Sequence, residues 1–200
     1  MSEVKLYTLD TDVFRHMASR NSAQQYKRAN RRFWWLILSE VKDYRANLLT
    51  PKQVRYELEV QFYNLPNRET EMIRRLLKNT VTSVDKCNRE IEHTIRLMES
   101  FVKAHYSEDI STELPQYKIE YGGINDANIL YSAWREDSIL VTANIKDFLF
   151  YVFLFEYDED RLYDLLRGEF VHISNTLIHK ILNDEEFKHL YSNFKYLAKD

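Results

Sequence analysis

The chain has 200 residues, with 28 Lys and Arg against 31 Asp and Glu and a formal net charge of −3. A chain of this length is expected to form one domain, or one domain with a substantial extension. Its three glycines and three prolines are too few for a glycine-rich phosphate loop or for a β-sandwich with many turns. The single cysteine excludes an intramolecular disulfide. A net charge so near zero neither favours nor excludes nucleic acid as a partner.

The sequence also bears on where the protein works. Its start has no hydrophobic signal segment. The longest apolar run, residues 148–155, is much shorter than the about 20 residues that a membrane helix needs. We therefore expect a soluble, cytoplasmic protein that does not contact a membrane.

The first third of the chain predicts two strands and two helices. Residues 4–9 form a β-rich apolar run that is typical of a buried strand. A helical pattern over residues 21–47 leads into a possible second strand at 46–49. Thr50 and Pro51 then predict a helix start, with the threonine as N-cap and the proline in the first helical position. That helix is expected to end near residue 64.

The middle of the chain is predicted to be mostly helical. Helices are expected over residues 68–78 and 85–105, followed by an irregular polar stretch over 108–121. A further helix is expected from residue 125 or 126 to 136. The continuous apolar run at 138–142 predicts another buried strand.

The last quarter begins with an unusually apolar segment. Residues 148–155 are apolar on every side, so they form either a buried helix or an association surface. A helix is expected over 161–167, a strand over 169–173, and a helix at the C-terminus. This order of elements predicts an α/β fold with a small, mostly parallel sheet flanked by helices.

Four acids stand where acids are unusual. Asp10 follows the first strand and Asp147 follows the strand at 138–142, and open parallel sheets bind ligands at such strand ends. Glu57 and Asp126 have helical spacing to apolar residues, so they face inward. A lone carboxylate on an apolar face is costly unless it is paired or bound to a metal. Each acid also has an ordinary interpretation, as a helix cap or as a solvated partner of an arginine.

Four segments resemble the successive motifs of PIN-domain nucleases, the family that includes the VapC-type toxins. The segments are LYTLDTDVF, TPKQVRYELE, INDANILYSA and LVTANIKDF. The last one, a strand followed by T-x-N-x-x-D-F, is the most specific. The resemblance covers residues 4–13, 47–60 and 124–148. It implies a PIN-like domain over 1–155, with a helical insertion at about 65–120, and a C-terminal extension over 156–200 that packs on the same domain.

The resemblance further implies a metal-dependent ribonuclease. The acids that would bind Mg²⁺ or Mn²⁺ and carry out the hydrolysis are Asp10, Glu57, Asp126 and Asp147. Neighbouring Asp12, Thr142 and Asn144 would orient these acids. Many members of the family carry an acid where Asn144 stands, so the number of metal ions stays open. The partners it implies are an RNA substrate and a small antitoxin protein, with a homodimer left open.

An RNA substrate needs a cationic surface. Residues of this kind lie on one face of the helix at 21–47 and near Glu57, and they are Lys27, Arg28, Arg31, Arg32, Lys52 and Arg55. Contacts between such side chains and phosphates give affinity that depends strongly on salt. The alternative is an ordinary solvated helix face.

Two other functions fit parts of the sequence. The segment LDTDVF also resembles the start of the haloacid-dehalogenase phosphatases, in which Asp10 would be a covalent nucleophile and Asp12 a general acid. That family usually carries a late Gly-Asp pair, which this chain lacks. The third interpretation is a catalytically inactive PIN-like interaction module, with residues 148–155, Trp34 and Trp35 as its apolar surface.

Overall fold

The computed structural model describes residues 4–83, 87–120 and 122–199. Its strands form one sheet in the order β3-β2-β1-β4-β5-β6, and all neighbours are parallel except β5 and β6. The strands are β1 (Lys5–Leu9), β2 (Ala46–Thr50), β3 (Val81–Thr82), β4 (Ile139–Thr142), β5 (Leu162–Asp164) and β6 (Glu169–Phe170). The α/β class and the mostly parallel sheet are therefore confirmed.

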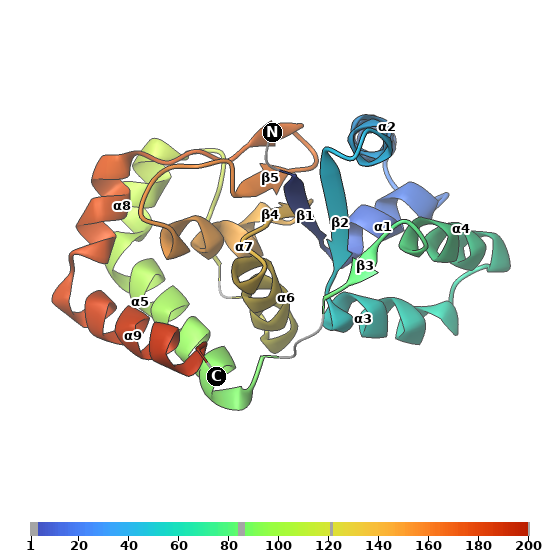
Figure 1. Ribbon diagram of the computed structural model, residues 1–200. Helices are drawn as coiled ribbons and strands as arrows, with labels where there is room; N and C mark the ends of the chain where they lie inside the picture. The colour runs from blue at the N-terminus through green and yellow to red at the C-terminus, as the bar shows by residue number, and fades with distance from the viewer. Residues whose placement is uncertain (1–3, 84–86, 121, 200) are drawn as a thin grey trace.

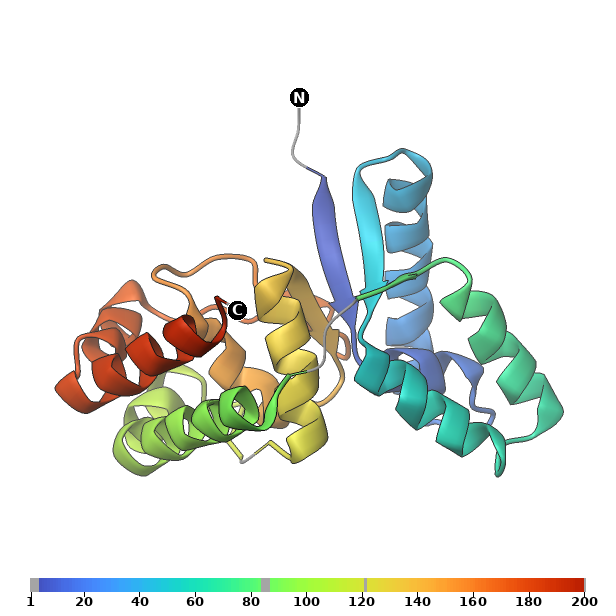
Figure 2. The ribbon, with the colours of Figure 1, turned by 60° about the horizontal axis from the view of Figure 1, so that its bottom comes forward.

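Helices flank this sheet in two groups (Figures 1 and 2). Beside β2 and β3 lie α1 (Thr11–Ala18), α2 (Gln24–Lys42), α3 (Lys52–Phe62) and α4 (Asn67–Leu77). On the other side of β1 lie α5 (Arg89–Glu113), α6 (Ile124–Arg135), α7 (Ile145–Phe148), α8 (Asn175–Leu182) and α9 (Glu185–Leu197). The long helix α5 packs against α6, α8 and α9. In the described part of the chain, no helix has the length and apolar character needed to cross a membrane.

The segment over 148–155 belongs to the core. Leu149–Leu154 form a short 3-10 helix, η1, and every one of these six residues is at most 5% exposed. The expectation of a buried helix is confirmed, and an association surface at these residues is excluded. Trp34 is also buried, whereas Trp35 is 74% exposed on the outer side of α2.

The prediction of a helix over residues 161–167 is wrong. Leu162–Asp164 form β5, which pairs in parallel with β4, so that Leu162 lies beside Leu140. A turn then follows because the Asp164 carboxylate accepts the N–H groups of Leu166 and Arg167 at 2.8 and 3.1 Å. Pairing with a neighbouring strand overrides the weak helical pattern of this segment.

The prediction of an irregular stretch over residues 108–121 is wrong for its first part, because α5 continues to Glu113. Tyr106 and Ile110 extend the buried face of this helix. It ends at Leu114, directly before Pro115, as expected for a residue that precedes proline. The start expected at residue 85 lies outside the described residues, and α5 begins at Arg89 after the N-cap Asn88.

The N-cap expected at Thr50 is also wrong. Thr50 is the last residue of β2, and α3 begins at Lys52 with Pro51 in the cap position. The Thr50 hydroxyl donates instead to the hydroxyl of Thr80 at 2.8 Å. This contact lies beside β3, a two-residue strand that pairs with the end of β2 and that the sequence pattern did not predict.

Candidate functional site

The sheet topology creates a crevice at the carboxyl ends of β1 and β4. From the central strand β1, the chain passes to β2 on one side and returns to β4 on the other. Open parallel sheets bind ligands at such a point, outside the strand ends. Asp10 directly follows β1, and its N–H donates to the carbonyl of Val141 in β4 at 3.1 Å.

Asp10 is the most buried of the four predicted acids, with 6% of its surface exposed. Its carboxylate accepts the N–H of Thr11 at 2.6 Å and the hydroxyl of Thr142 at 2.7 Å. Burial raises the pKa of Asp10 to about 8 and repulsion from Asp12 adds to this, against the two hydrogen bonds, which lower it. Asp10 is also the N-cap of α1, so the ordinary interpretation of this residue is confirmed alongside its place in the crevice.

Glu57 reaches the crevice from α3. One of its carboxylate oxygens accepts the hydroxyl of Thr11 at 2.6 Å, and the other accepts the side-chain amide of Gln53 at 3.1 Å. Val54 and Leu58 on the same side of the helix are fully buried, as the spacing predicted. Glu57 is half-buried. Its hydrogen bond from Thr11 holds it toward the first residue of α1.

Asp126 lies in the first turn of α6. Its carboxylate accepts the N–H of Gly123 at 2.6 Å, so it closes the start of its own helix as the ordinary interpretation expected. Burial raises the pKa of Asp126, the bond from Gly123 opposes this, and repulsion from Asp147 and Glu57 raises it further. Although Asp126 caps a helix, it therefore lies near enough to two of the other predicted acids for their charges to raise its pKa.

Asp147 lies in α7, just after β4. Burial raises the pKa of Asp147, whereas Lys146 and a hydrogen bond from the Asn144 side chain lower it. The backbone N–H of Asn144 donates to the Thr142 hydroxyl at 2.9 Å, and that hydroxyl in turn donates to Asp10. Thr142 thus links the acid at the end of β1 to the loop that carries Asp147.

Electrostatic repulsion joins these acids into one group. Half-buried Asp12 raises the pKa of Asp10, Asp126 and Asp147. Yet no three His, Cys, Asp or Glu side chains in the described residues stand close enough to enclose a metal ion. Each of the four predicted acids is turned toward a hydrogen-bond donor of its own. The donor set consists of carboxylate oxygens, which suit hard cations such as Mg²⁺ and Mn²⁺.

A fifth acid, which the sequence analysis missed, belongs to the same neighbourhood. Glu99 of α5 is 3% exposed, and burial raises its pKa to about 8. A hydrogen bond from the backbone of Gly122 lowers this pKa, and the charges of Asp126 and Asp147 raise it. The signal was in the sequence, because Glu99 lies on the buried face of α5, four residues after Ile95.

Five of the six predicted cations fall into three groups. Arg28 and Arg32 line an open hollow together with Leu166. Leu166 follows β5, so this hollow lies at the same edge of the sheet as the acids. Arg31 and Lys52 are exposed. Lys27 is half-buried and donates to the backbone carbonyl of Arg20.

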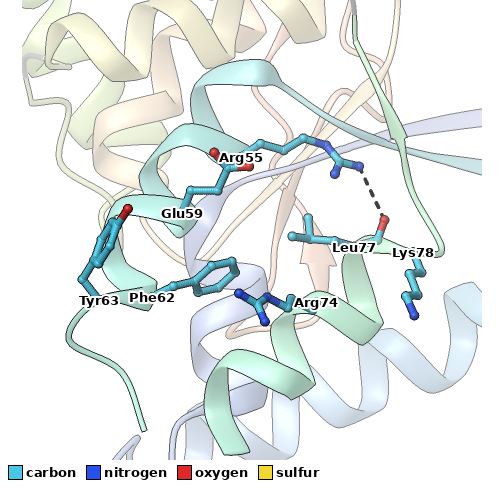
Figure 3. A pocket seen from close by; sticks show the side chains of 7 residues that line it. All are labelled: Arg55, Glu59, Phe62, Tyr63, Arg74, Leu77 and Lys78. Carbon is cyan, nitrogen blue, oxygen red and sulfur yellow. Dashed lines mark hydrogen bonds between the residues drawn. The ribbon is translucent and has the colours of Figure 1, made fainter. Parts of the chain in front are cut away.

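Arg55 has a structural role that the sequence did not indicate (Figure 3). Its guanidinium donates to the carbonyl of Leu77 at 3.4 Å and to the hydroxyl of Thr80 at 3.1 Å, which ties α3 to the end of α4. It lines a hollow of about 780 Å³ in which the Arg74 guanidinium lies 5.1 Å from the centre of the Phe62 ring. Arg55 is therefore committed to protein carbonyls, as basic residues often are near helix C-termini.

Comparisons with known proteins include a distant structural likeness. No family model matches the chain, and no curated protein matches it. A chain in the crystal structure of VapBC2 from Rickettsia felis, bound to a DNA fragment from their promoter, is similar with a TM-score of 0.43 and 15% sequence identity. The match covers 70% of this chain and 89% of that one.

Proposed function

We propose that the chain is a PIN-type, metal-dependent endoribonuclease whose acids gather at the carboxyl edge of the sheet. The observation that carries the proposal is the placement of carboxylates from separate elements beside the carboxyl ends of β1 and β4. Asp10 follows β1, Asp126 begins α6 and Asp147 lies in α7, and each has a raised pKa to which at least one other acid contributes. Buried like charges of this kind are destabilising unless a cation offsets them.

The donor chemistry fits a divalent cation. Four carboxylates would hold it, from Asp10, Glu57, Asp126 and Asp147. When bound, Mg²⁺ or Mn²⁺ lowers the pKa of a water ligand, which allows attack on a phosphodiester near neutral pH. Whether one ion or two are bound depends on how far Asn144 replaces the acid that many relatives carry.

The chain's own residues orient the acids and the substrate. Thr142 donates to Asp10, and Thr11 donates to Glu57 through its hydroxyl. Such bonds hold each carboxylate in one orientation. Binding a cation would require the acids to turn from these donors toward the ion. Arg28 and Arg32, on the same edge of the sheet, would bind backbone phosphates of the RNA.

The two alternatives are less well supported. A nucleophilic Asp10 would have to be ionised and accessible, but this carboxyl is 6% exposed, both of its oxygens accept hydrogen bonds, and its pKa is raised to about 8. The inactive interaction module relied partly on residues 148–155 and Trp34. Leu149–Leu154 and Trp34 are buried in the core, which leaves exposed Trp35 from that surface.

The motif resemblance adds partners to this proposal. A small antitoxin protein would bind the enzyme and hold it inactive in the cytoplasm, and the chain would form the toxin of the pair. Its support is the sequence of the four motifs, above all LVTANIKDF. Co-expression with the product of a neighbouring small gene, followed by co-purification, tests this part separately from catalysis.

The decisive experiment compares Asp126→Asn with wild type on labelled RNAs and single-stranded DNAs, with Mn²⁺, Mg²⁺ or a chelator. We expect metal-dependent cleavage of RNA that falls at least about 100-fold in the variant, since a ligand and its charge are lost. Asp43→Asn is the matched control, because exposed Asp43 lies just before β2, at the opposite edge of the sheet. Absence of cleavage by folded wild type in every metal would refute the proposal.

A further inference from the structure

Glu99 is a buried acid that the four-acid site does not use. It lies in the middle of α5, within the helical segment that the PIN motifs do not cover, and 3% of it is exposed. Burial raises the pKa of Glu99, and the charge of Arg96 lowers it. A buried carboxylate is expected to accept hydrogen bonds that replace those it would make with water.

The partner of Glu99 is the backbone just before α6. Gly122 donates its N–H to the Glu99 carboxylate. The next residue, Gly123, donates its N–H to the carboxylate of Asp126 at 2.6 Å. Two successive backbone amides are therefore held by two carboxylates, one from α5 and one from α6, and this pair of bonds is here called the glycine clamp.

Packing around Gly122 shows how closely these groups approach one another. A Cβ atom at this position would lie 3.1 Å from Oε1 of Glu99, 3.2 Å from the carbonyl oxygen of Asp147 and 3.3 Å from Cβ of Asp126. All three distances are tighter than ordinary van der Waals contact. The absence of a side chain at Gly122 thus lets α5 approach two of the predicted metal ligands.

We propose that Glu99 is a positioning residue for the acid site: through the glycine clamp, it sets the place of Asp126 relative to Asp147. The inference rests on the proposed function for its catalytic consequence, and on the geometry alone for the clamp itself. It also gives α5 a role, because the helix delivers a hydrogen-bond acceptor to the site from outside the motif-bearing segments. Hydrogen bonds that orient metal ligands typically change affinity or activity by about 10–100-fold.

The test uses two substitutions at one position. Glu99→Gln keeps an oxygen that accepts the Gly122 N–H, whereas Glu99→Leu keeps the volume and removes the acceptor. We expect Glu99→Leu to weaken Mn²⁺ binding, measured by calorimetry, and RNA cleavage by about 10-fold or more. Glu99→Gln should restore both to within about 3-fold of wild type, because positioning needs the acceptor and not the charge. Glu108→Leu, at an exposed acid of the same helix, is the control.

A second readout separates the clamp from catalysis. Amide hydrogen exchange of Gly122 and Gly123, followed by NMR, should be at least about 10-fold faster in Glu99→Leu and close to wild type in Glu99→Gln. Unchanged exchange in Glu99→Leu would refute the clamp. Loss of Mn²⁺ binding in Glu99→Gln with protected amides would also refute positioning, because the charge would then be the active feature. If wild type binds no Mn²⁺ and cleaves no RNA, the proposed function fails, while the exchange rates still decide whether Glu99 holds the backbone.

Discussion

Asp10→Asn is expected to make the metal-free protein more stable at high pH. Burial, aided by repulsion from Asp12, raises the pKa of Asp10 from 3.8 to about 8. An acid whose pKa is raised on folding binds more protons in the folded than in the unfolded state. The free energy of unfolding therefore falls as the pH rises from about 4 to about 8. Asparagine cannot ionise, and it remains a favoured N-cap for α1.

The size of this effect follows from the two pKa values of Asp10. With one pH unit worth about 1.4 kcal/mol, the Asp10 contribution should fall by roughly 4 kcal/mol between pH 5 and pH 9 in wild type. It should be absent in Asp10→Asn. For a chain of this size, each kcal/mol shifts the melting temperature by about 2–4 °C. The stability gap between variant and wild type should therefore widen by roughly 10 °C over this pH range.

The assay is thermal and urea unfolding followed by circular dichroism, at pH 5, 7 and 9, with a chelator present. Asp43→Asn serves as the control for a charge removed at an exposed site. The reasoning is refuted if wild type and Asp10→Asn lose the same free energy of unfolding between pH 5 and pH 9. Mn²⁺ at about 100 times its Kd should then restore about 3 kcal/mol to wild type at pH 9. It should restore much less to the variant, which lacks one ligand.

Three further variants test the contacts of individual side chains. Thr142→Val should lower the free energy of unfolding by about 1–3 kcal/mol in urea titrations, because the Asp10 carboxylate and the Asn144 N–H lose their partner. The double variant Arg28→Gln, Arg32→Gln should weaken RNA binding and reduce the salt slope of its log affinity by about 0.7 per arginine. Arg55→Met should cost about 1–3 kcal/mol of stability in the same titrations, since the α4 carbonyls lose a charged donor.

A specific experimental result would contradict each of these three predictions. Thr142→Val with unchanged stability would mean that the two bonds contribute nothing net. A double substitution on the far helices, Lys180→Gln with Lys188→Gln, removes the same charge away from the acids, and an equal loss of RNA affinity would contradict a local role of the arginines. If Arg55→Met keeps full stability but binds RNA more weakly, Arg55 contacts the nucleic acid and does not stabilise the fold.

The sequence was informative about the polar residues at the ends of the buried strands. Asp10 and Thr142 could be assigned to strand ends, because apolar runs of four or five residues end abruptly in polar side chains. The structure brings Asp10 and Thr142 into hydrogen-bond contact across two strands that are 132 residues apart in the chain. The two side chains can meet because parallel strands end at one edge of a sheet. The role of Thr142 was predicted only through the family resemblance.

The sequence failed where tertiary contacts decide. Nothing in the pattern around Leu162 shows that β4 offers it a partner, so the sequence predicts a helix where strand β5 lies. Arg55 had the charge and position of a phosphate ligand, and only the fold reveals the α4 carbonyls beside it. Glu99 is a different case, because the argument that identified Glu57 and Asp126 applies to it unchanged. The motif resemblance does not extend to α5, which carries Glu99.

The apolar core and the buried acids of this fold contribute to its stability in opposite directions. The interior around η1 is almost entirely apolar, with Tyr151 and Phe153 fully buried. Asp10 and Glu99, by contrast, carry carboxyls that resist ionisation at one edge of the sheet. Functional sites commonly hold such unfavourable charges and depend on the rest of the fold for stability. A cation bound at this edge would therefore both enable the proposed chemistry and relieve the main electrostatic strain. Metal affinity should for this reason rise with pH, as the carboxyls ionise, over the same range in which the stability of the metal-free protein falls.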